Sequence, residues 1–364
     1  MLSEAYDKFL EYSVLDLGNN SRIKSVLKKA EAGEHITFAF LGGSITEGYK
    51  VGRENCYGKI FSEKFGGEYS SIDNIHSINA GLAGTDSLMG LIRVERDVLQ
   101  YKPDLIFVEF AVNDIKDALH REAYESLLLR LLKSEKMPAI LLIFVRAQAG
   151  YTCQGQMQAA GEYYHLPMIS ISDAISLMME EENMLWSDYA DDHIHPHKQG
   201  NILIADCILH YISKVNAMSS DTELELPVEP LYGDSYVTMQ LIDAENALLS
   251  DHGDFKPDKR TYQFVHGLMH GKVAGKQPFL LRIKAKHLFV IYRESNDTNA
   301  GCADVYIDGI RKCSLDSYKI TGWDNPDIRH ILSQDTVSEH SIEIKMSSGE
   351  EHKEFAILAF GYCD

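Results

Sequence analysis

The sequence predicts two domains of different classes, a doubly wound α/β sandwich followed by an all-β domain. Its 364 residues exceed what one ordinary hydrophobic core holds together. In the first part, apolar strand-like runs alternate with helical segments every 25–35 residues or so, the spacing of parallel βαβ units (about 30 residues each). After residue 230 the helical period fades, and short β-rich segments separated by Gly, Asp and Asn take its place.

Apolar runs mark the strands of the first domain. They lie at residues 36–41, 75–80, 105–111, 139–145 and 168–171. Runs of this kind, with little alternation, are typical of strands buried on both faces. Because helices separate them, the strands should be parallel, with helices on both faces of the sheet. We therefore predict a five-stranded parallel sheet.

Helical segments fill the intervals between these strands. The expected helices cover residues 3–12, 21–31, 56–65, 87–100, 121–135, 153–164, 173–182 and 198–214. Asn20 or Ser21 can cap the second helix, and Gly33 can end it. Residues 186–197 have no regular period and predict a polar loop before the last helix.

The domain boundaries follow from the change of pattern. We place the first domain at residues 1–215, with an N-terminal helical segment over 1–34, a linker at 216–230 and the second domain at 231–364. Strand-like segments of the second domain lie at residues 235–242, 260–266, 279–285, 287–293, 303–307, 310–314, 341–346 and 354–360. Asp308-Gly309 predicts a tight hairpin turn. This pattern predicts a β-sandwich or jelly roll.

Composition excludes several classes of partner. The formal net charge of -19 argues against binding nucleic acid or an anionic membrane surface. No apolar run reaches the roughly 18 residues that span a bilayer. The start, from Met1 to Lys8, lacks the apolar core of a signal peptide and predicts a cytoplasmic protein. Six scattered cysteines without a CxxC motif predict free, mostly buried thiols. The oligomeric state stays open.

Polar or flexible residues follow three of the predicted strands, and another group lies in the loop over 186–197. Gly43-Ser44 follows the first strand, Gly84 lies in the loop after the second, and Asn113 follows the third. Asp192-His193-Ile194-His195 lies in the last loop, where Asp and His three apart can meet on one turn. The carboxyl ends of parallel strands share one edge of the sheet, where ligands bind. Ser44 is therefore a candidate nucleophile.

Together these four blocks resemble the SGNH (GDSL-like) hydrolases, named for Ser, Gly, Asn and His along a flavodoxin-like domain. The resemblance covers roughly residues 34–212 and implies a flavodoxin-like sandwich. This chain departs from the family pattern at two positions. The usual Asp before the serine is Gly43, and the usual Gly two before the asparagine is Ala111.

The resemblance implies a Ser-His-Asp mechanism of ester hydrolysis. Ser44 would attack the carbonyl, His195 would take and return the proton, and Asp192 would fix the imidazole. The backbone N–H groups of Ser44 and Gly84 and the amide of Asn113 would form the oxyanion hole. No cofactor is implied.

Other interpretations of the same residues fail or are weaker. The segment Gly43 to Lys50 lacks the Gly-Lys pair of a phosphate-binding loop, and Thr46 takes the place of the second glycine of an α/β-hydrolase elbow. His193, His195 and His197 alternate as zinc ligands can, but no second histidine cluster lies nearby in the sequence. We therefore predict no metal. Trp186 either lines the pocket or anchors the loop.

A β-sandwich after an SGNH domain resembles the two-domain carbohydrate acetylesterases, of which the acetyl-mannan esterases are the nearest in arrangement. This resemblance implies removal of O-acetyl groups from oligosaccharides, with manno-oligosaccharides favoured. Trp323 lies in a turn-rich segment, and we expect it to contact the sugar. The alternatives are a lipase or thioesterase of the same superfamily and a non-catalytic carbohydrate-binding protein.

Overall fold

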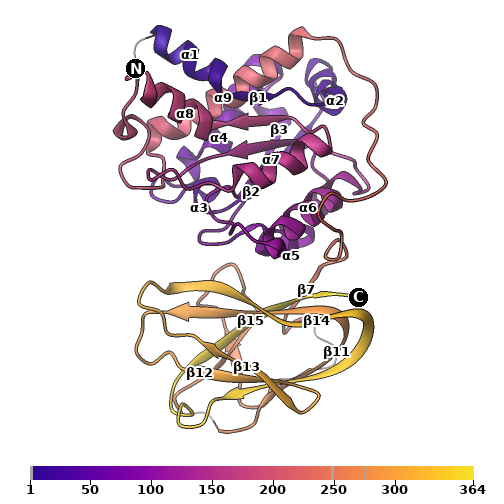
Figure 1. Ribbon diagram of the computed structural model, residues 1–364, viewed down its shortest axis with the longest axis vertical. Helices are drawn as coiled ribbons and strands as arrows, with labels where there is room; N and C mark the ends of the chain where they lie inside the picture. Colours follow the sequence, from indigo (N-terminus) through magenta and orange to yellow (C-terminus); the bar gives the residue numbers. More distant parts are fainter. Residues whose placement is uncertain (1–2, 247–249, 274) are drawn as a thin grey trace. The chain divides into compact units, whose positions relative to one another are not determined.

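The computed structural model describes residues 3–246, 250–273 and 275–364 (Figure 1). Residues 1–2 of the predicted first domain and residues 247–249 and 274 of the predicted second domain lie outside this description. The chain divides into two compact units, Met1–Asp234 and Ser235–Asp364. The first unit is α/β and the second is all-β, and both predicted classes are therefore confirmed.

The first unit alternates strands and helices along the chain. Its strands are β1 (Val14–Asp16), β2 (Ile36–Gly42), β3 (Ile75–Gly81), β4 (Leu105–Glu109), β5 (Ala139–Phe144) and β6 (Met168–Ser170). Its α-helices are α1 (Ser3–Ser13), α2 (Ser21–Glu31), α3 (Ser44–Glu47), α4 (Tyr57–Tyr69), α5 (Ser87–Asp97), α6 (Ala118–Leu132), α7 (Gln154–Tyr163), α8 (Ile171–Glu180) and α9 (Lys198–Ala217). Short 3₁₀ turns lie at Arg53–Asn55, Ile72–Asn74, Leu99–Tyr101 and Trp186–Asp188.

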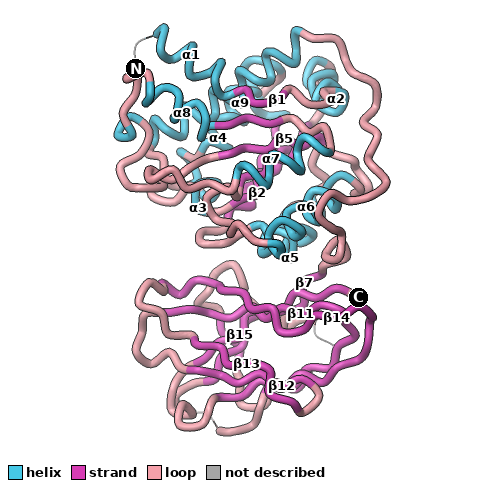
Figure 2. The backbone as a smooth tube through the Cα atoms, viewed as in Figure 1, coloured by secondary structure: helices cyan, strands magenta, loops and turns pink. Residues whose placement is uncertain are grey.

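The sheet of the first unit has the strand order β1-β6-β5-β4-β2-β3. Strands β2 to β6 are parallel, as predicted, and their order is that of a flavodoxin-like fold. Helices cover both faces of this sheet (Figures 1 and 2). The antiparallel edge strand β1, which pairs with β6, was not predicted. Its three residues are too few to show a strand pattern.

The core explains why apolar runs form the central strands. Every residue of β4 and β5 is buried. The rings of Phe40 on β2 and Phe107 on β4 stack with centroids 4.5 Å apart. A Cβ atom at Gly58 would lie 2.8 Å from the Phe40 ring, so this glycine lets α4 pack closely on the sheet. Burying each such aromatic side chain contributes about 1.5–3 kcal/mol, which makes this sheet a rigid support for its loops.

The whole segment predicted as a linker, residues 216–230, belongs to the first unit. Asn20 donates from Nδ2 to the Ser219 carbonyl (3.0 Å) and accepts from the Asp221 N–H (2.9 Å). Farther on, the N–H groups of residues 231–233 donate to the buried carboxylate of Glu125, at 2.5, 2.5 and 2.9 Å. These partners lie far away in the sequence, which is why the segment shows no local pattern.

The second unit consists of antiparallel strands. They are β7 (Gln240–Ile242), β8 (Ser250–Asp251), β9 (Lys256–Asp258), β10 (Gly267–His270), β11 (Phe279–Ser295), β12 (Cys302–Ile307), β13 (Ile310–Asp316), β14 (Trp323–Met346) and β15 (Phe355–Cys363). Hydrogen bonds link them in the order β13-β12-β14-β11-β15-β10-β9, with β7 on β15 and β8 on β11. The described strands thus form one connected antiparallel sheet.

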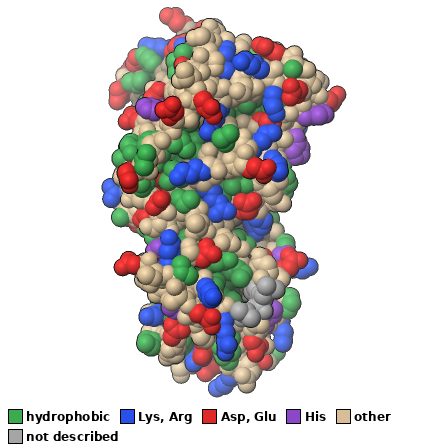
Figure 3. Space-filling view, turned by 90° about the vertical axis from the view of Figure 1, so that its right-hand side faces the viewer, with side chains coloured by type: hydrophobic (Ala, Val, Ile, Leu, Met, Phe, Trp, Pro, Cys, Tyr) green, Lys and Arg blue, Asp and Glu red, His purple; other side chains and the backbone are tan. Residues whose placement is uncertain are grey.

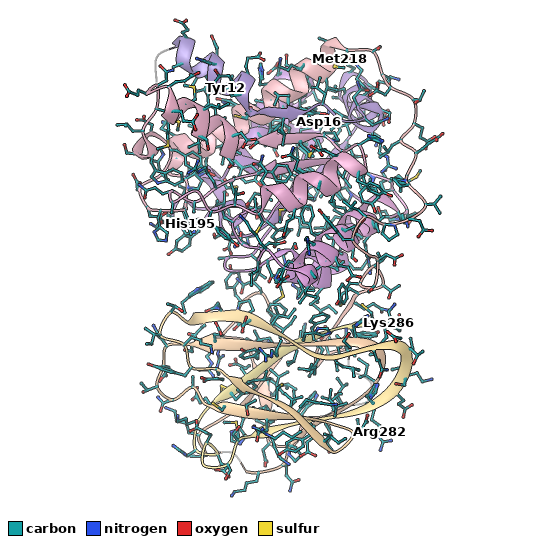
Figure 4. The ribbon with its side chains drawn as sticks, in the orientation of Figure 1. Tyr12, Asp16, His195, Met218, Arg282 and Lys286 are labelled. Atoms are coloured by element: carbon teal, nitrogen blue, oxygen red, sulfur yellow. The ribbon has the colours of Figure 1, made fainter. Side chains whose placement is uncertain are left out.

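The long strand β11 bends partway along its length. Pairing with β14 is interrupted between Ala285 and His287, so Lys286 has no partner on β14. Figure 4 labels Lys286 on the second unit. Core residues before the interruption are odd-numbered (Phe279, Leu281, Ile283), and those after it are even-numbered (Leu288, Val290, Tyr292). The irregularity shifts the alternation by one residue and keeps one face on the core while the strand bends. The predicted strands 279–285 and 287–293 are therefore one bent strand, and 260–266 forms no strand.

The surface and the thiols agree with the composition. Acidic and basic side chains are interspersed over the face drawn in Figure 3. The six cysteines are free, with Cys56, Cys153, Cys207 and Cys363 buried. Within the described residues, no helix is long and apolar enough to cross a membrane.

Candidate active site

The predicted nucleophile lies where the strand order of the first sheet reverses. Strand β2 pairs with β3 on one side and β4 on the other. Ser44 is the first residue of α3, two residues beyond the end of β2, and Asn113 follows β4. The switch point of an open α/β sheet forms a crevice at the carboxyl ends of its strands. His195 lies at the same end of this unit as α3 (Figures 1 and 4).

Ser44, His195 and Asp192 form a continuous hydrogen-bonded chain. Ser44 Oγ lies 3.0 Å from His195 Nε2, and His195 Nδ1 lies 2.9 Å from Asp192 Oδ2. Ser44 is buried, with 8% of its surface exposed. These distances allow a proton to move from the hydroxyl to the imidazole while the carboxylate holds the opposite ring nitrogen.

Asp192 is held by its own loop. Its Oδ1 accepts from the N–H groups of Ile194 (2.8 Å) and His195 (2.6 Å). Its backbone carbonyl accepts from Trp186 Nε1 at 2.6 Å, so Trp186 anchors the loop. Burial acts to raise the pKa of Asp192, but hydrogen bonds from Lys50 and these N–H groups outweigh it and hold the pKa well below its usual range. Asp192 is therefore a carboxylate at neutral pH.

The predicted oxyanion donors lie on three neighbouring loops. The N–H of Ser44 belongs to the first turn of α3, where N–H groups have no intrahelical acceptor. Gly84 lies in the loop after β3 with a φ of 72°, a conformation that favours glycine. The Asn113 side chain packs directly against Gly43. A Cβ atom added at Gly43 would lie 2.4 Å from Asn113 Oδ1. The missing side chain at position 43 thus makes room for Asn113.

Buried polar contacts tie the loop of Gly84 to the nucleophile turn. The Ala83 N–H donates to Glu47 Oε2 on α3 at 3.0 Å, and Asn79 Nδ2 donates to the Thr46 carbonyl at 2.9 Å. The buried guanidinium of Arg93 donates to the carbonyls of Ala80 (2.7 Å) and Gly42 (3.1 Å). These contacts therefore link the ends of β2 and β3 to each other and to α3.

A second network ties the loop of Gly84 to the loop of Asn113. Buried Asp114 accepts from the N–H and Oγ of Ser87 at 2.7 and 2.6 Å. His120 Nε2 lies 3.2 Å from Asp86 Oδ2, and its Nδ1 lies 2.8 Å from Asp117 Oδ1. These two aspartates cap the N-termini of α5 and α6. Although burial opposes the charged form, these carboxylates raise the pKa of His120 to about 9. The imidazolium thus bridges the two loops at neutral pH.

Beneath the nucleophile turn lies a buried carboxyl group that the sequence analysis did not find. Glu109, the last residue of β4, is fully buried and accepts from Thr46 Oγ1 at 3.1 Å. Thr46 Oγ1 in turn lies 2.8 Å from the hydroxyl of Tyr57. Burial raises the pKa of Glu109 to about 7, against weaker lowering by hydrogen bonds from Thr46 and the Gly43 backbone.

The remaining predicted residues have different surroundings. His197 caps α9 by accepting from the Gly200 N–H at 3.1 Å, and His193 is exposed. Among the described residues, no group of His, Cys, Asp and Glu is arranged to hold a metal ion. Trp323 begins β14 in the second unit, and 52% of its surface is exposed. Tyr49 and Lys50, which contact His195 and Asp192, were missed because these partners are distant in the sequence.

Sequence comparison relates the first unit to a known family. Residues 40–202 match the GDSL-like Lipase/Acylhydrolase family. The chain is also 25% identical, over 183 residues, to Thioesterase 1/protease 1/lysophospholipase L1 of Escherichia coli strain K12. That alignment covers 50% of this chain and 85% of the relative. The same protein of Escherichia coli O6:H1 matches equally well.

Structural comparison relates the whole chain to a solved enzyme. The fold matches a two-domain esterase (CEX) active on acetylated mannans and co-crystallised with mannopentaose, with a TM-score of 0.88 and 26% sequence identity. The match covers 97% of both chains. A second structure of a two-domain esterase (CEX) active on acetylated mannans gives the same TM-score and identity and is covered to 98%. The resemblance inferred from the four sequence blocks is confirmed.

Proposed function

We propose that this protein is a serine esterase that removes O-acetyl groups from oligosaccharides, because residues 40–202 match the GDSL-like Lipase/Acylhydrolase family. The observation that carries this proposal is the chain of contacts from Ser44 through His195 to Asp192, at 3.0 and 2.9 Å. We favour manno-oligosaccharides, because the esterase matched over 97% of this chain is active on acetylated mannans.

In this proposal Ser44 Oγ attacks the acetyl carbonyl carbon while His195 Nε2 takes the hydroxyl proton. The tetrahedral intermediate then collapses, the bond to the sugar oxygen breaks, and His195 returns the proton to that oxygen. Water attacks the acetyl-enzyme in the same way and releases acetate. Asp192 stabilises the imidazolium formed in each step. General-base help of this kind contributes about 10²–10⁴-fold to the rate.

The oxyanion of each intermediate would be held by the Ser44 and Gly84 N–H groups and by the Asn113 amide. Support for this assignment comes from their loops, which buried contacts from Glu47, Arg93 and Asp114 hold together. Donors fixed in advance stabilise developing charge without reorganising during the reaction. We further propose that Trp323 contacts the sugar, since an exposed indole can stack on an apolar sugar face.

A second candidate is hydrolysis of fatty acyl esters or thioesters. It is favoured by the 25% identity to the Escherichia coli thioesterase and lysophospholipase. The two candidates differ in the acyl group they accept. Aryl esters from acetate to decanoate therefore separate them, because an acetylesterase loses activity as the chain lengthens and a thioesterase or lipase gains it.

The decisive experiment compares the wild type with Ser44→Ala. Incubation with acetylated manno-, xylo- and pectic oligomers, followed by mass spectrometry, should show acetyl loss with the wild type only. We expect Ser44→Ala to lose at least about 10³-fold in kcat without unfolding, because no nucleophile remains. Ser25→Ala, an exposed serine on α2, is the matched control. Near-wild-type turnover by Ser44→Ala would refute the proposal.

A further inference from the structure

Lys50 binds the same carboxylate that orients His195. Its Nζ lies 2.5 Å from Asp192 Oδ2, the oxygen that also faces His195 Nδ1. With the two N–H groups on Oδ1, the carboxylate has four partners. A carboxylate offers about four lone-pair sites, so this set occupies them all.

The position of Lys50 follows from the turn that ends α3. Gly48 has a φ of 90° and closes the helix, and the Tyr49 N–H donates to the Ser44 carbonyl at 3.0 Å. Lys50 itself has a φ of 68°, which is uncommon for a residue with a side chain. This turn points the chain back toward the loop of Asp192 and His195. The Tyr49 ring lies 4.7 Å from the His195 ring in the same arrangement.

A contribution to stability does not explain why Lys50 is held against Asp192. The Lys50 side chain is 47% exposed, and exposed ion pairs of this kind contribute little to stability. The titratable groups that act on Lys50 are the carboxyl groups of Asp192 and Asp191 and the phenol of Tyr49. Its partner Asp192 is the group that stabilises the imidazolium under the proposed function. The effect of Lys50 should therefore appear in the chemistry of His195 and not in stability.

We propose that Lys50 is a positioning residue that fixes Asp192 and sets the lower pH limit of activity. The inference rests on the proposed function. The ammonium group neutralises part of the Asp192 charge and therefore disfavours the imidazolium form of His195. His195 is a base only when it is neutral. Lys50 thus keeps the base available in mildly acidic solution, at the cost of weaker stabilisation of the imidazolium.

The test compares wild type, Lys50→Met and Lys50→Arg over pH 5–9 with 4-nitrophenyl acetate. In Lys50→Met we expect the midpoint of the acidic fall in kcat/KM (the acidic limb) to move upward by about 0.5–1 pH unit. At pH values below this midpoint, kcat/KM should then be ~3–10-fold lower than in the wild type. At pH 8, kcat/KM should stay within about threefold of the wild type. Lys50→Arg keeps the charge and should restore the wild-type limb. Lys59→Met, which removes a lysine paired with Glu63 on α4, is the matched control and should change nothing.

A direct readout does not depend on turnover. The NMR titration midpoint of the His195 Cε1 proton should rise in Lys50→Met by the same amount as the limb. An unchanged midpoint and limb would overturn the inference, and so would a large loss at all pH values with no shift. If the wild type has no Ser44-dependent esterase activity, the proposed function fails, while the NMR midpoint still decides the role of Lys50.

Discussion

Asp192 is the residue whose surroundings limit substitution most strongly. Both of its oxygens accept hydrogen bonds, so an amide there would turn a donor toward Lys50 and His195 or toward two backbone N–H groups. We expect Asp192→Asn to lower kcat by roughly 10⁴-fold, because the imidazole is no longer held in the correct tautomer.

Steady-state kinetics with an aryl acetate measure this loss. Asp191→Asn removes the same formal charge from an exposed neighbouring position and serves as the control. A loss of less than tenfold in Asp192→Asn would mean that another acceptor orients His195.

Glu109 makes a separate prediction about stability. Burial raises its pKa from 4.5 to about 7, so the folded protein holds this proton more tightly than the unfolded chain does. The contribution of Glu109 to the free energy of unfolding is therefore greatest below about pH 4.5. It falls as the pH rises through 7, by about 3 kcal/mol in all. Glu109→Gln carries no charge, and its stability relative to the wild type should increase between pH 5 and pH 8.

Urea unfolding followed by Trp186 fluorescence measures this difference. The Trp323→Phe background removes the other tryptophan, so that only the first unit is observed. Glu135→Gln, at an exposed position, should show no such pH dependence. An equal difference at both pH values would show that Glu109 is not buried as a proton-binding carboxyl group.

At the scale of elements, the site depends on how closely the turn before α3 approaches the loop after β4. A methyl group at position 43 would meet the Asn113 side chain at 2.4 Å, so Gly43→Ala should displace Asn113. If the amide is an oxyanion donor, kcat should fall by about 10²–10³-fold while KM changes little. Gly155→Ala on α7 adds a methyl group with nothing within 4 Å and serves as the control. Full activity of Gly43→Ala would contradict the assignment of Asn113.

Elements with strong local patterns were predictable from the sequence, and others were not. The apolar runs of β2, β4 and β5 predicted the parallel sheet. The spacing from Asp192 to His195 predicted that this carboxylate orients this imidazole. The start of β14, Trp323 to Pro326, is polar and contains a proline, so it shows no strand pattern although β11 pairs with it. Lys50 and Asp192 lie 142 residues apart, and no local signal connects them. Contacts of this kind are set by the fold.

At the scale of the whole molecule, the proposed role of Trp323 is testable without assuming how the units are arranged. If the indole contacts the sugar, Trp323→Ala should lower kcat/KM on acetylated oligosaccharides by about tenfold or more, the size of a hot-spot aromatic contact, and leave 4-nitrophenyl acetate unaffected. Ile310→Ala removes another exposed apolar side chain from the second unit and is the control. If Trp323→Ala kept the wild-type kcat/KM on both substrates, the sugar contact would be refuted.

The contact between Gly43 and Asn113 also limits how this sequence can evolve. A Cβ atom at position 43 and the present Asn113 side chain would occupy the same space, so the two positions cannot diverge independently. A lineage that acquires a side chain before the serine must also move or replace the Asn113 side chain. An aspartate placed at position 43 alone would therefore displace the Asn113 side chain, and we expect such an exchange not to be neutral.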